Sequence, residues 1–413
     1  MKAELITIGD ELLYGHTVDT NAAFIGEKIA EAGIELVYHT TVGDEPGSML
    51  NAFALAMNRS DVVLTTGGLG PTHDDITKKV ICKYFKRQLV FHEEILTELE
   101  KRYQTMGIKM PPINQNQALL PQGASFLRNR IGSALGIVME EHRKVFISMP
   151  GVPSEMEIMV TEELLPFLAK KAGNQVIIHR RLRTFGLMES AIFEKVKNLV
   201  EEKSIVSIAF LPGYHGVDIR LTAKSGNEVE THRIIDDMEK RFLEKIGDYV
   251  YGFDSDELPG MIGKLLTERK MTIAVAESCT GGLLGKMITD IPGSSAYFLG
   301  GVIAYGNEIK MKLLSVPSET LEKYGAVSEE TATSMAEGVR KLTGADIGVS
   351  ITGIAGPDGG TAEKPVGLVY VGISAKGKSE VKEFKYGLSR DRTRNRTAYS
   401  ALDMVRRFLQ NLI

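Results

Sequence analysis

Residues 61–71 read Asp-Val-Val-Leu-Thr-Thr-Gly-Gly-Leu-Gly-Pro, an apolar run that passes directly into a glycine-rich loop. A short apolar run bounded by turn residues is typical of a strand that is buried on both faces of a parallel sheet. Two further strands are expected before it, at 3–8 and 34–42, with a helix over 21–32 between them. This alternation predicts a parallel sheet with right-handed crossovers.

The loops that follow these three strands carry acids and glycines. Because ligands of open α/β sheets bind outside the carboxyl ends of the strands, we expect these loops to face one crevice. Carboxylates beside a glycine loop suit a phosphoanhydride and a divalent ion such as Mg²⁺, Mn²⁺ or Co²⁺, among which the sequence does not choose. As an alternative, two of these acids, Asp10 and Asp75, cap helices. The predicted metal ligands are Asp10, Asp44, Asp74 and Asp75.

A small α+β module is expected from about residue 171, with strands over 176–185 and 205–224. It contains Gly213-Tyr214-His215-Gly216, the GxxG pattern of nucleic-acid-binding KH domains. A KH loop joins two helices, whereas this segment joins two strands and has no basic patch around it. The sequence therefore favours a hairpin turn and argues against direct nucleic-acid binding.

A third unit follows the polar Pro-Gly segment 254–260, which is the expected linker. Its strands and helices alternate as in the first unit and predict a second α/β sandwich. The expected fold class is therefore α/β, with two sandwich domains that have mainly parallel sheets, joined by a small α+β KH-like module. The predicted domains cover residues 1–170, 171–253 and 254–413. The third unit has predicted strands at 271–276, 298–305, 347–352, 366–374 and 381–385, and helices at 283–289, at 328–342 and up to 413.

Length, charge and cysteine content favour a multidomain protein of a reducing compartment and argue against a nucleic-acid-binding or membrane protein. A length of 413 residues suits two or three domains, and a formal charge of -4 gives no overall attraction to nucleic acid or anionic membrane. Two cysteines, Cys82 and Cys279, are too few for a disulfide framework, which favours a reducing compartment. Without a signal peptide or a long apolar stretch, the sequence predicts a cytoplasmic protein with no membrane partner.

Ser278 is the candidate nucleophile of the third unit. It follows a predicted strand, and Gly281 and Gly282 allow a sharp turn into a helix whose free N–H groups are expected to stabilise an oxyanion. His232 is the last histidine of the chain, so a Ser-His-Asp triad within this unit is excluded. A lysine of depressed pKa is the remaining common activator, and Lys310 lies where it can turn back toward the serine.

Each of these residues also has a purely structural interpretation. Ser278 suits a helix N-cap, Lys310 a solvated helix face, and Tyr305 the end of a strand. Cys279, next to the candidate nucleophile, is expected to be a small buried hydrophobe.

Four segments carry a resemblance to known families. Residues 65–75 (TTGGLGPTHDD) and 149–156 (MPGVPSEM) resemble the MoaB/MogA-like domain of molybdopterin-cofactor synthesis. Residues 276–282 (AESCTGG) and 352–360 (TGIAGPDGG) resemble the nicotinamide mononucleotide (NMN) deamidase domain. In this order, around a KH-like middle, they resemble the CinA family over essentially the whole chain.

The resemblance implies roles for individual residues. It implies a Ser278–Lys310 pair assisted by Tyr305, no cofactor in this domain, and a phosphate-binding arginine that is Arg390, favoured by spacing, or Arg392. Leu388-Ser389-Arg390 departs from the Gly-Asp-Arg usual in the family, which leaves Arg392 open as a shifted match. The expected substrate contacts are Gly281, Gly282, Thr352, Gly353 and Arg390 in the third unit, and Gly67, Gly68, Gly70, Ser133, Gly151, Ser154 and Glu155 in the first.

The sequence and its resemblance together predict a bifunctional enzyme of pyridine-nucleotide recycling. The third unit would hydrolyse NMN to nicotinate mononucleotide and ammonia, and the first would hydrolyse ADP-ribose to AMP and ribose 5-phosphate with a divalent metal. Two alternatives stay open: a molybdopterin-binding or adenylyl-transfer enzyme, and a non-catalytic partner protein of competence or DNA repair. A homodimer or higher homo-oligomer is expected.

Overall fold

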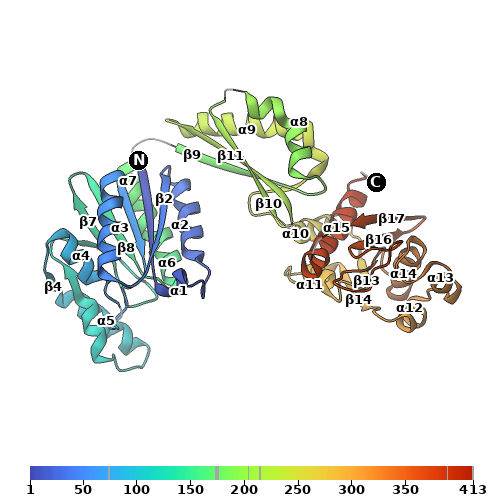
Figure 1. Cartoon of the computed structure of the whole chain (residues 1–413), viewed down its shortest axis with the longest axis horizontal. Helices are drawn as coiled ribbons and strands as arrows, with labels where there is room; N and C mark the ends of the chain where they lie inside the picture. Colours follow the sequence, from blue (N-terminus) through green and yellow to red (C-terminus); the bar gives the residue numbers. More distant parts are fainter. Residues whose placement is uncertain (73–74, 173–175, 203, 214, 388, 412–413) are drawn as a thin grey trace. The chain divides into compact units, whose positions relative to one another are not determined.

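The computed structural model describes residues 1–413 except 73–74, 173–175, 203, 214, 388 and 412–413 (Figure 1). Two compact units divide the chain, one of residues 1–178 with 224–232 and one of residues 179–223 with 233–413. The predicted α/β class is confirmed, since helices alternate with strands that form several sheets. In the described part of the chain, every helix is too short or too polar to cross a membrane.

The N-terminal sheet has the strand order β2-β1-β3-β8-β7-β6. The predicted strand at 61–66 is β3, whose five residues are all buried. Its side chains alternate between two cores: Val63 packs with α3 and α4, and Leu64 packs with α2 and α6 on the other face. The elements are β1 (Lys2–Ile8), α1 (Asp10–Leu13), α2 (Thr20–Glu31), β2 (Glu35–Val42), α3 (Pro46–Arg59), β3 (Val62–Thr66), α4 (Thr77–Phe85), β4 (Leu89–Phe91), α5 (Glu93–Thr105), η1 (Pro112–Ala118), β5 (Leu119–Pro121), β6 (Ser125–Leu127), β7 (Gly136–Glu141), β8 (Lys144–Met149), α6 (Pro153–Met159), η2 (Val160–Leu164) and α7 (Leu165–Ala172).

One edge of this sheet is antiparallel, which the sequence pattern did not predict. Strands β2, β1, β3 and β8 run parallel, but β7 pairs antiparallel with both β8 and β6. Only His142 and Arg143, both with positive φ, connect β7 to β8. A connection of two residues can join antiparallel strands only, because parallel strands need a crossover of a dozen residues or more.

The middle module is a four-stranded sheet of order β10-β11-β9-β12 with two helices. Strands β10 and β11 pair antiparallel up to Gly213 and Gly216, which lie opposite each other. The predicted hairpin at the GxxG segment is therefore confirmed, while Tyr214 lies outside the described residues. The elements are β9 (Val176–Thr184), α8 (Glu189–Glu201), β10 (Val206–Gly213), β11 (Gly216–Ser225), α9 (Glu228–Ile246), η3 (Gly247–Tyr249) and β12 (Val250–Phe253).

The C-terminal sheet has the order β14-β13-β15-β16-β17. Strands β14, β13 and β15 are parallel, and β16 and β17 are antiparallel additions. On the central strand, Val275 packs against α10, α11 and α15, and Ala276 packs against α12 and α14 on the opposite face. The elements are α10 (Leu258–Arg269), β13 (Ile273–Glu277), α11 (Leu283–Thr289), η4 (Ser294–Ala296), β14 (Phe298–Ile303), α12 (Asn307–Leu314), α13 (Ser318–Tyr324), α14 (Glu329–Thr343), β15 (Ile347–Gly353), β16 (Leu368–Ala375), β17 (Lys378–Lys385) and α15 (Arg390–Leu409).

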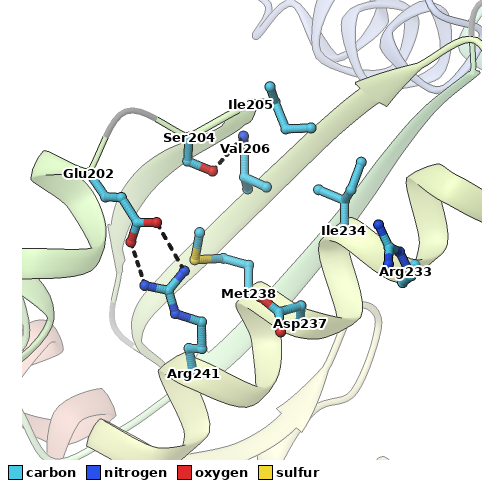
Figure 2. Close-up of a pocket in the computed structure, with 9 residues that line it drawn as sticks. All are labelled: Glu202, Ser204, Ile205, Val206, Arg233, Ile234, Asp237, Met238 and Arg241. Carbon is cyan, nitrogen blue, oxygen red and sulfur yellow. Dashed lines mark hydrogen bonds and ion pairs between the residues drawn. The ribbon is translucent and has the colours of Figure 1, made fainter.

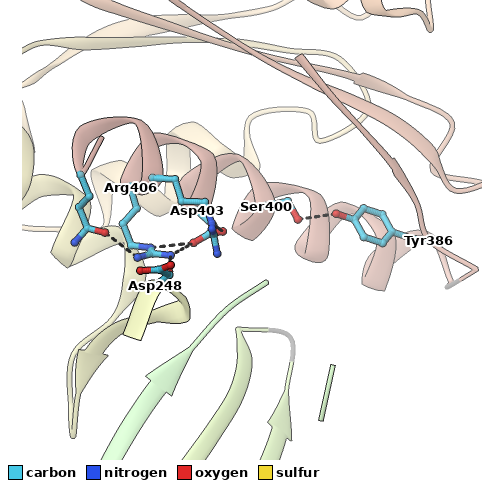
Figure 3. A network of polar contacts seen from close by, with 7 residues as sticks. Asp248, Tyr386, Ser400, Asp403 and Arg406 are labelled. Atoms are coloured by element: carbon cyan, nitrogen blue, oxygen red, sulfur yellow. Dashed lines mark hydrogen bonds and ion pairs between the residues drawn. The ribbon is translucent and has the colours of Figure 1, made fainter. Parts of the chain in front are cut away.

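Helix α15 joins this sheet to the middle module through a buried arginine (Figure 3). Arg406 is 1% exposed and donates from Nε and Nη2 to Asp403 Oδ1, at 2.9 and 2.7 Å, and from Nη2 to the carbonyl oxygen of Asp248 at 2.9 Å. The ring of Phe185 in the middle module also stacks on that of Tyr399 in α15. A buried guanidinium is tolerated only when its donors are satisfied, so these contacts hold the two sheets in one unit.

Replacing Asp403 should unfold this unit more easily. Asp403→Asn leaves the buried Arg406 charge without its counter-ion, which we expect to lower the free energy of unfolding by about 3–5 kcal/mol. Urea denaturation followed by circular dichroism measures the change. Asp391→Asn, on an exposed turn of the same helix, is the control and should unfold as the unsubstituted chain does. Equal urea midpoints for the two variants would show that Asp403 does not stabilise the unit as the counter-ion of Arg406.

Candidate active sites

Ser278 lies directly after the central strand of the C-terminal sheet. Its N–H donates to the carbonyl of Ile351 at 2.9 Å, so the sheet pattern extends one residue beyond β13. Gly281 and Gly282 then take φ values of 60° and 97°, which only glycine adopts without strain, and helix α11 begins at the next residue. Ser278 is 8% exposed, so the turn presents a largely enclosed hydroxyl.

Lys310, from the second turn of α12, lies against this hydroxyl. Its Nζ donates to Ser278 Oγ at 3.2 Å, and to the carbonyl oxygens of Ala304 and Tyr305 at 2.7 and 3.1 Å. The side chain is 1% exposed. Two carbonyls therefore take two N–H groups, and the third direction of the amine faces the serine. In the neutral amine that direction is the lone pair, which can accept the serine proton.

Burial lowers the pKa of Lys310 below its ordinary value of 10.5, because the charged form loses its hydration. The neutral amine is consequently available at a lower pH than in an exposed lysine. The interpretation of Lys310 as a solvated surface residue is wrong for this structure, since its whole side chain is buried.

Cys279 is buried beside the serine, as the sequence predicted. Burial raises the pKa of its thiol to about 11, so it is protonated at neutral pH. A protonated, enclosed thiol is a poor nucleophile, and the hydroxyl of Ser278 stays the candidate.

Tyr305 and Arg390 meet at the open side of the site. Arg390 donates from Nη1 to the carbonyl of Gly356 at 2.7 Å, and its Nη2 lies 3.5 Å from the Tyr305 hydroxyl. The Tyr305 side chain is 62% exposed, and among the described contacts its hydroxyl meets Arg390 while its backbone carbonyl meets Lys310. Direct assistance of the serine by this hydroxyl stays a prediction, as does the choice of Arg390 over Arg392.

Thr352 and Gly353 lie at the end of β15, next to the strand that leads to Ser278. Thr352 is buried, and its hydroxyl donates to the carbonyl of Ala326 at 2.6 Å. This bond already uses the hydroxyl proton, so a substrate contact by Thr352 stays a prediction.

Glu277 and Arg394 are two residues that the sequence reasoning missed. The carboxylate of Glu277 accepts bonds from the N–H groups of Gly282, Leu284 and Gly285, so the expectation that the N–H groups at this helix start are free is wrong for these three. Arg394 donates from Nη2 to the carbonyl of Thr280 at 2.6 Å. Its signal was present in the sequence, because it lies four residues after Arg390 on the same helical face.

In the N-terminal unit, the glycine loop after β3 lies against the 149–151 segment. Gly67 donates its N–H to the carbonyl of Met149 at 3.1 Å, and Thr66 Oγ1 donates to the carbonyl of Pro150 at 2.8 Å. A Cβ on Gly151 would lie 3.2 Å from Gly67 Cα, so this close approach favours glycine at position 151. The two motifs are thus side by side. Gly68, at φ 64°, continues the turn, and Thr77 at the start of α4 donates to Gly67 O at 3.0 Å.

Three of the predicted carboxylates gather near this loop. Asp10 and Asp44 exchange bonds, each accepting the other's N–H at 3.2 Å. The pKa of Asp44 is raised by burial and then by the charges of Asp10, Glu11 and Asp75, although a backbone bond from Asp10 opposes this. Asp75 is already bonded to the N–H groups of Gly70 and Thr72 at 2.8 and 2.9 Å.

A metal centre is not assembled by these residues. Within the described residues, no three imidazole, thiol or carboxylate side chains are grouped so that they could hold an ion. Both carboxylate oxygens of Asp75 accept hydrogen bonds from the loop, and Asp74 lies outside the described residues. The described carboxylates therefore do not fit a metal site by themselves, and metal dependence stays a prediction.

The remaining predicted contacts of this unit are Ser133, in the loop between β6 and β7, and Ser154 and Glu155, on the first turn of α6. Arg102 donates to the carbonyl oxygens of Asn129 and Gly132, which precedes Ser133. The Asn129 amide in turn donates to Glu155 Oε2 at 2.6 Å, so Glu155 is occupied in fixing this loop. Ser154 is exposed at the start of α6. The structure thus brings the side chain of Glu155, on α6, against the loop that contains Ser133.

Lys78 is a buried residue of this unit that the sequence did not single out. Its Nζ donates to Gln117 Oε1 at 2.7 Å, and the Gln117 amide donates to the carbonyl of Leu69 in the glycine loop at 3.0 Å. Burial lowers the pKa of Lys78 to about 8, an effect that the charge of Asp75 partly offsets. This chain of contacts ties α4 to the loop.

A hollow of about 500 Å³ lies in the middle module between α9 and the edge strand β10 (Figure 2). Val206 and Met238 are buried apolar residues of its lining, and Arg241 of the lining pairs with Glu202. None of the residues that line it belongs to the predicted sites. The lining consists of Glu202, Ser204, Ile205, Val206, Arg233, Ile234, Asp237, Met238 and Arg241.

Comparison with known proteins gives matches along the whole chain. Residues 4–170 match the family model described as "Probable molybdopterin binding domain", residues 179–252 match "Damage-inducible protein CinA KH domain", and residues 255–409 match "CinA C-terminal domain". A CinA-like protein of Kosmotoga olearia is 45% identical over 413 residues, and one of Dictyoglomus thermophilum is 42% identical over 413 residues; each alignment covers 100% of both chains.

Among solved structures, the competence/damage inducible protein of Agrobacterium tumefaciens is 42% identical. The match covers 37% of this chain and 93% of that one, with a TM-score of 0.36.

The reactivity of Ser278 should depend on the protonation of Lys310. Because burial lowers the pKa of this amine, labelling of Ser278 by a fluorophosphonate should rise with pH through a midpoint below 10.5 and level off at higher pH. Lys310→Met should slow labelling by roughly a hundredfold or more, since the general base is lost. Lys312→Met, at an exposed position of the same helix, is the control and should label at the unsubstituted rate. Labelling of Lys310→Met at that rate would exclude the amine as base.

Proposed function

The chain belongs to the CinA family, and from this premise we propose that its C-terminal domain is an amidase that hydrolyses NMN to nicotinate mononucleotide and ammonia. We further propose that its N-terminal domain hydrolyses ADP-ribose to AMP and ribose 5-phosphate. One observation carries the first proposal: the hydroxyl of Ser278 lies 3.2 Å from the buried amine of Lys310. A nucleophile within reach of a base of lowered pKa is the arrangement that acyl transfer requires.

The reaction proceeds through an acyl-serine. Ser278 Oγ attacks the carboxamide carbon of NMN while Lys310 Nζ takes the hydroxyl proton. The C–N bond of the amide then breaks, and Lys310 returns the proton to the departing nitrogen, which leaves as ammonia. Water attacks the acyl-serine and gives a proton to Lys310. That proton passes to Ser278 Oγ as nicotinate mononucleotide departs.

Arg390 supplies the charge that a mononucleotide needs. Its guanidinium is exposed next to Tyr305, and its bond to the carbonyl of Gly356 holds it on the loop that follows β15. An arginine fork matches a phosphate through two parallel N–H bonds. We assign the 5′-phosphate of NMN to this residue.

Removal of the nucleophile tests the amidase. Ser278→Ala should lower the rate of ammonia release from NMN by about a thousandfold or more, because attack then falls to unassisted water. Cys279→Ala, one residue away, is the matched control: the buried thiol is protonated, so most activity should remain. Ammonia release that survives in Ser278→Ala would overturn the acyl-serine, and inactivity of the unsubstituted protein toward NMN would overturn the substrate.

For the N-terminal domain, the supporting observation is the glycine loop between carboxylates. The loop at 67–70 is held open by Thr77 and by Asp75, and it lies beside Gly151. Backbone N–H groups of such loops suit phosphate oxygens. The fold alone does not select the nucleotide, so ADP-ribose is a proposal that draws on the family resemblance.

Asp75 should be essential for this second activity. Asp75→Ala frees Gly70 and Thr72, and the displaced loop should lower AMP formation from ADP-ribose by about a hundredfold or more. Asp61→Ala, which lies before β3 at the end of that strand far from the glycine loop, is the control and should keep the activity. Addition of EDTA tests metal dependence in the same assay.

Other outcomes would favour the alternatives. If ADP-ribose is inert and molybdopterin binds, the N-terminal domain is a molybdopterin-binding or adenylyl-transfer unit. If the folded protein turns over neither NMN nor ADP-ribose, a non-catalytic partner role becomes the better explanation.

A further inference from the structure

We propose that Glu277 is a positioning residue of the amidase, whose buried carboxylate holds the Ser278 turn within reach of Lys310. The proposal rests on the function proposed above for this site. It concerns a residue that touches no reacting atom, and that acts through the backbone of the nucleophile turn.

The carboxylate clamps the start of α11. Its Oε2 accepts the N–H groups of Gly282 and Leu284 at 3.0 and 3.1 Å, and its Oε1 accepts that of Gly285 at 2.7 Å. Glu277 is 1% exposed. The clamp therefore closes a ring of backbone from residue 277 to residue 285, and Ser278 lies within that ring.

Charge makes this clamp strong. Over the described part of the chain, Glu277 forms no ion pair, so these N–H groups and the positive end of α11 are what compensate its charge. Hydrogen bonds from N–H groups to an ionised acceptor are about twice as strong as neutral ones, and a carboxylate is favoured at a helix N-terminus. A buried carboxylate without such partners would be costly, so side chain and turn fix each other.

The alternation of side chains along β13 explains why Glu277 can bind the start of α11 while Ser278 faces Lys310. Successive side chains of a strand point to opposite faces. Val275 packs on the α11 face and Ala276 on the α12 face, so Glu277 follows onto the α11 face and Ser278 onto the α12 face, where Lys310 lies. Two adjacent residues thereby engage the helices on either side of the sheet.

The backbone of Glu277 also reaches the lysine. Its carbonyl accepts the N–H of Ala304 at 2.8 Å, and the carbonyl of Ala304 accepts the Lys310 amine at 2.7 Å. One residue thus contacts the turn that carries the nucleophile and the segment that orients the base.

The turn needs such a restraint. Gly281 and Gly282 give it the positive φ angles that it requires, but glycine also allows many other conformations. A misplacement of about 1 Å in a catalytic group can cost around a hundredfold in rate. Loss of the clamp should therefore lower turnover without changing how NMN binds.

The test is Glu277→Gln, which keeps the shape of the side chain but removes its charge and one acceptor. We expect kcat for NMN to fall by about 30- to 100-fold with KM within about twofold of the unsubstituted value. Fluorophosphonate labelling of Ser278 should fall by the same factor. Glu308→Gln, on the exposed first turn of α12, is the matched control and should leave both rates unchanged.

The pH profile separates positioning from a purely electrostatic role. Positioning lowers the plateau of the labelling profile and leaves its midpoint in place. A shifted midpoint with an unchanged plateau would mean that Glu277 acts on the charge of Lys310, which would overturn the proposal. Unchanged labelling in folded Glu277→Gln, checked by circular dichroism, would also overturn it.

Glu277→Asp serves if the glutamine variant does not fold. It keeps the charge but is one methylene shorter, so it cannot reach all three N–H groups, and it should label slowly with an unchanged midpoint. Labelling does not need NMN: a protein that labels at Ser278 but releases no ammonia refutes the amidase function alone, and the labelling rates then decide on Glu277.

Discussion

The buried amine of Lys310 is the constraint on which the C-terminal site depends. A lysine enclosed to this degree needs partners for its N–H groups, and the carbonyls of Ala304 and Tyr305 provide two of them. Those carbonyls follow β14, which pairs with the strand that ends before Ser278. The amine has three directions for hydrogen bonds, and the one that the two carbonyls do not use faces Ser278. The contacts that satisfy the buried Lys310 amine therefore also orient it as the base.

The glycine turns at 67–70 and 281–282 are both held in place by a polar side chain, but by different ones. Each follows a buried parallel strand and must reverse the chain into a helix, which positive φ angles at glycine allow. In the C-terminal domain the turn is held from inside by a carboxylate on the strand itself. In the N-terminal domain Asp75, after the loop, holds Gly70, and Gln117 holds Leu69. Restraint of a flexible turn by a neighbouring polar side chain is thus common to both.

The middle module carries a KH-like GxxG segment, yet the contacts described for the module are with helix α15 of the same chain. The segment closes a hairpin, and the module's rings and backbone pack on α15, the helix whose first turn carries Arg390. Arg406, Asp403 and their neighbours join the module to that helix. The module therefore supports the helix that supplies the phosphate-binding candidate.

The sequence by itself determined the α/β class, the strand before Ser278, the helix at 283–289 and the absence of a Ser-His-Asp triad built within the third unit. These conclusions need only local information, because apolar runs, glycine turns and the positions of the histidines can be identified from the sequence alone. The resemblance implies the Ser278–Lys310 pair, but only the tertiary structure decided that the Lys310 amine is held by the carbonyls of Ala304 and Tyr305. It alone also decided that Glu277 occupies three N–H groups and that the N-terminal sheet has an antiparallel edge. Such contacts join residues on different elements, so they depend on strand order and register, which local preference does not encode.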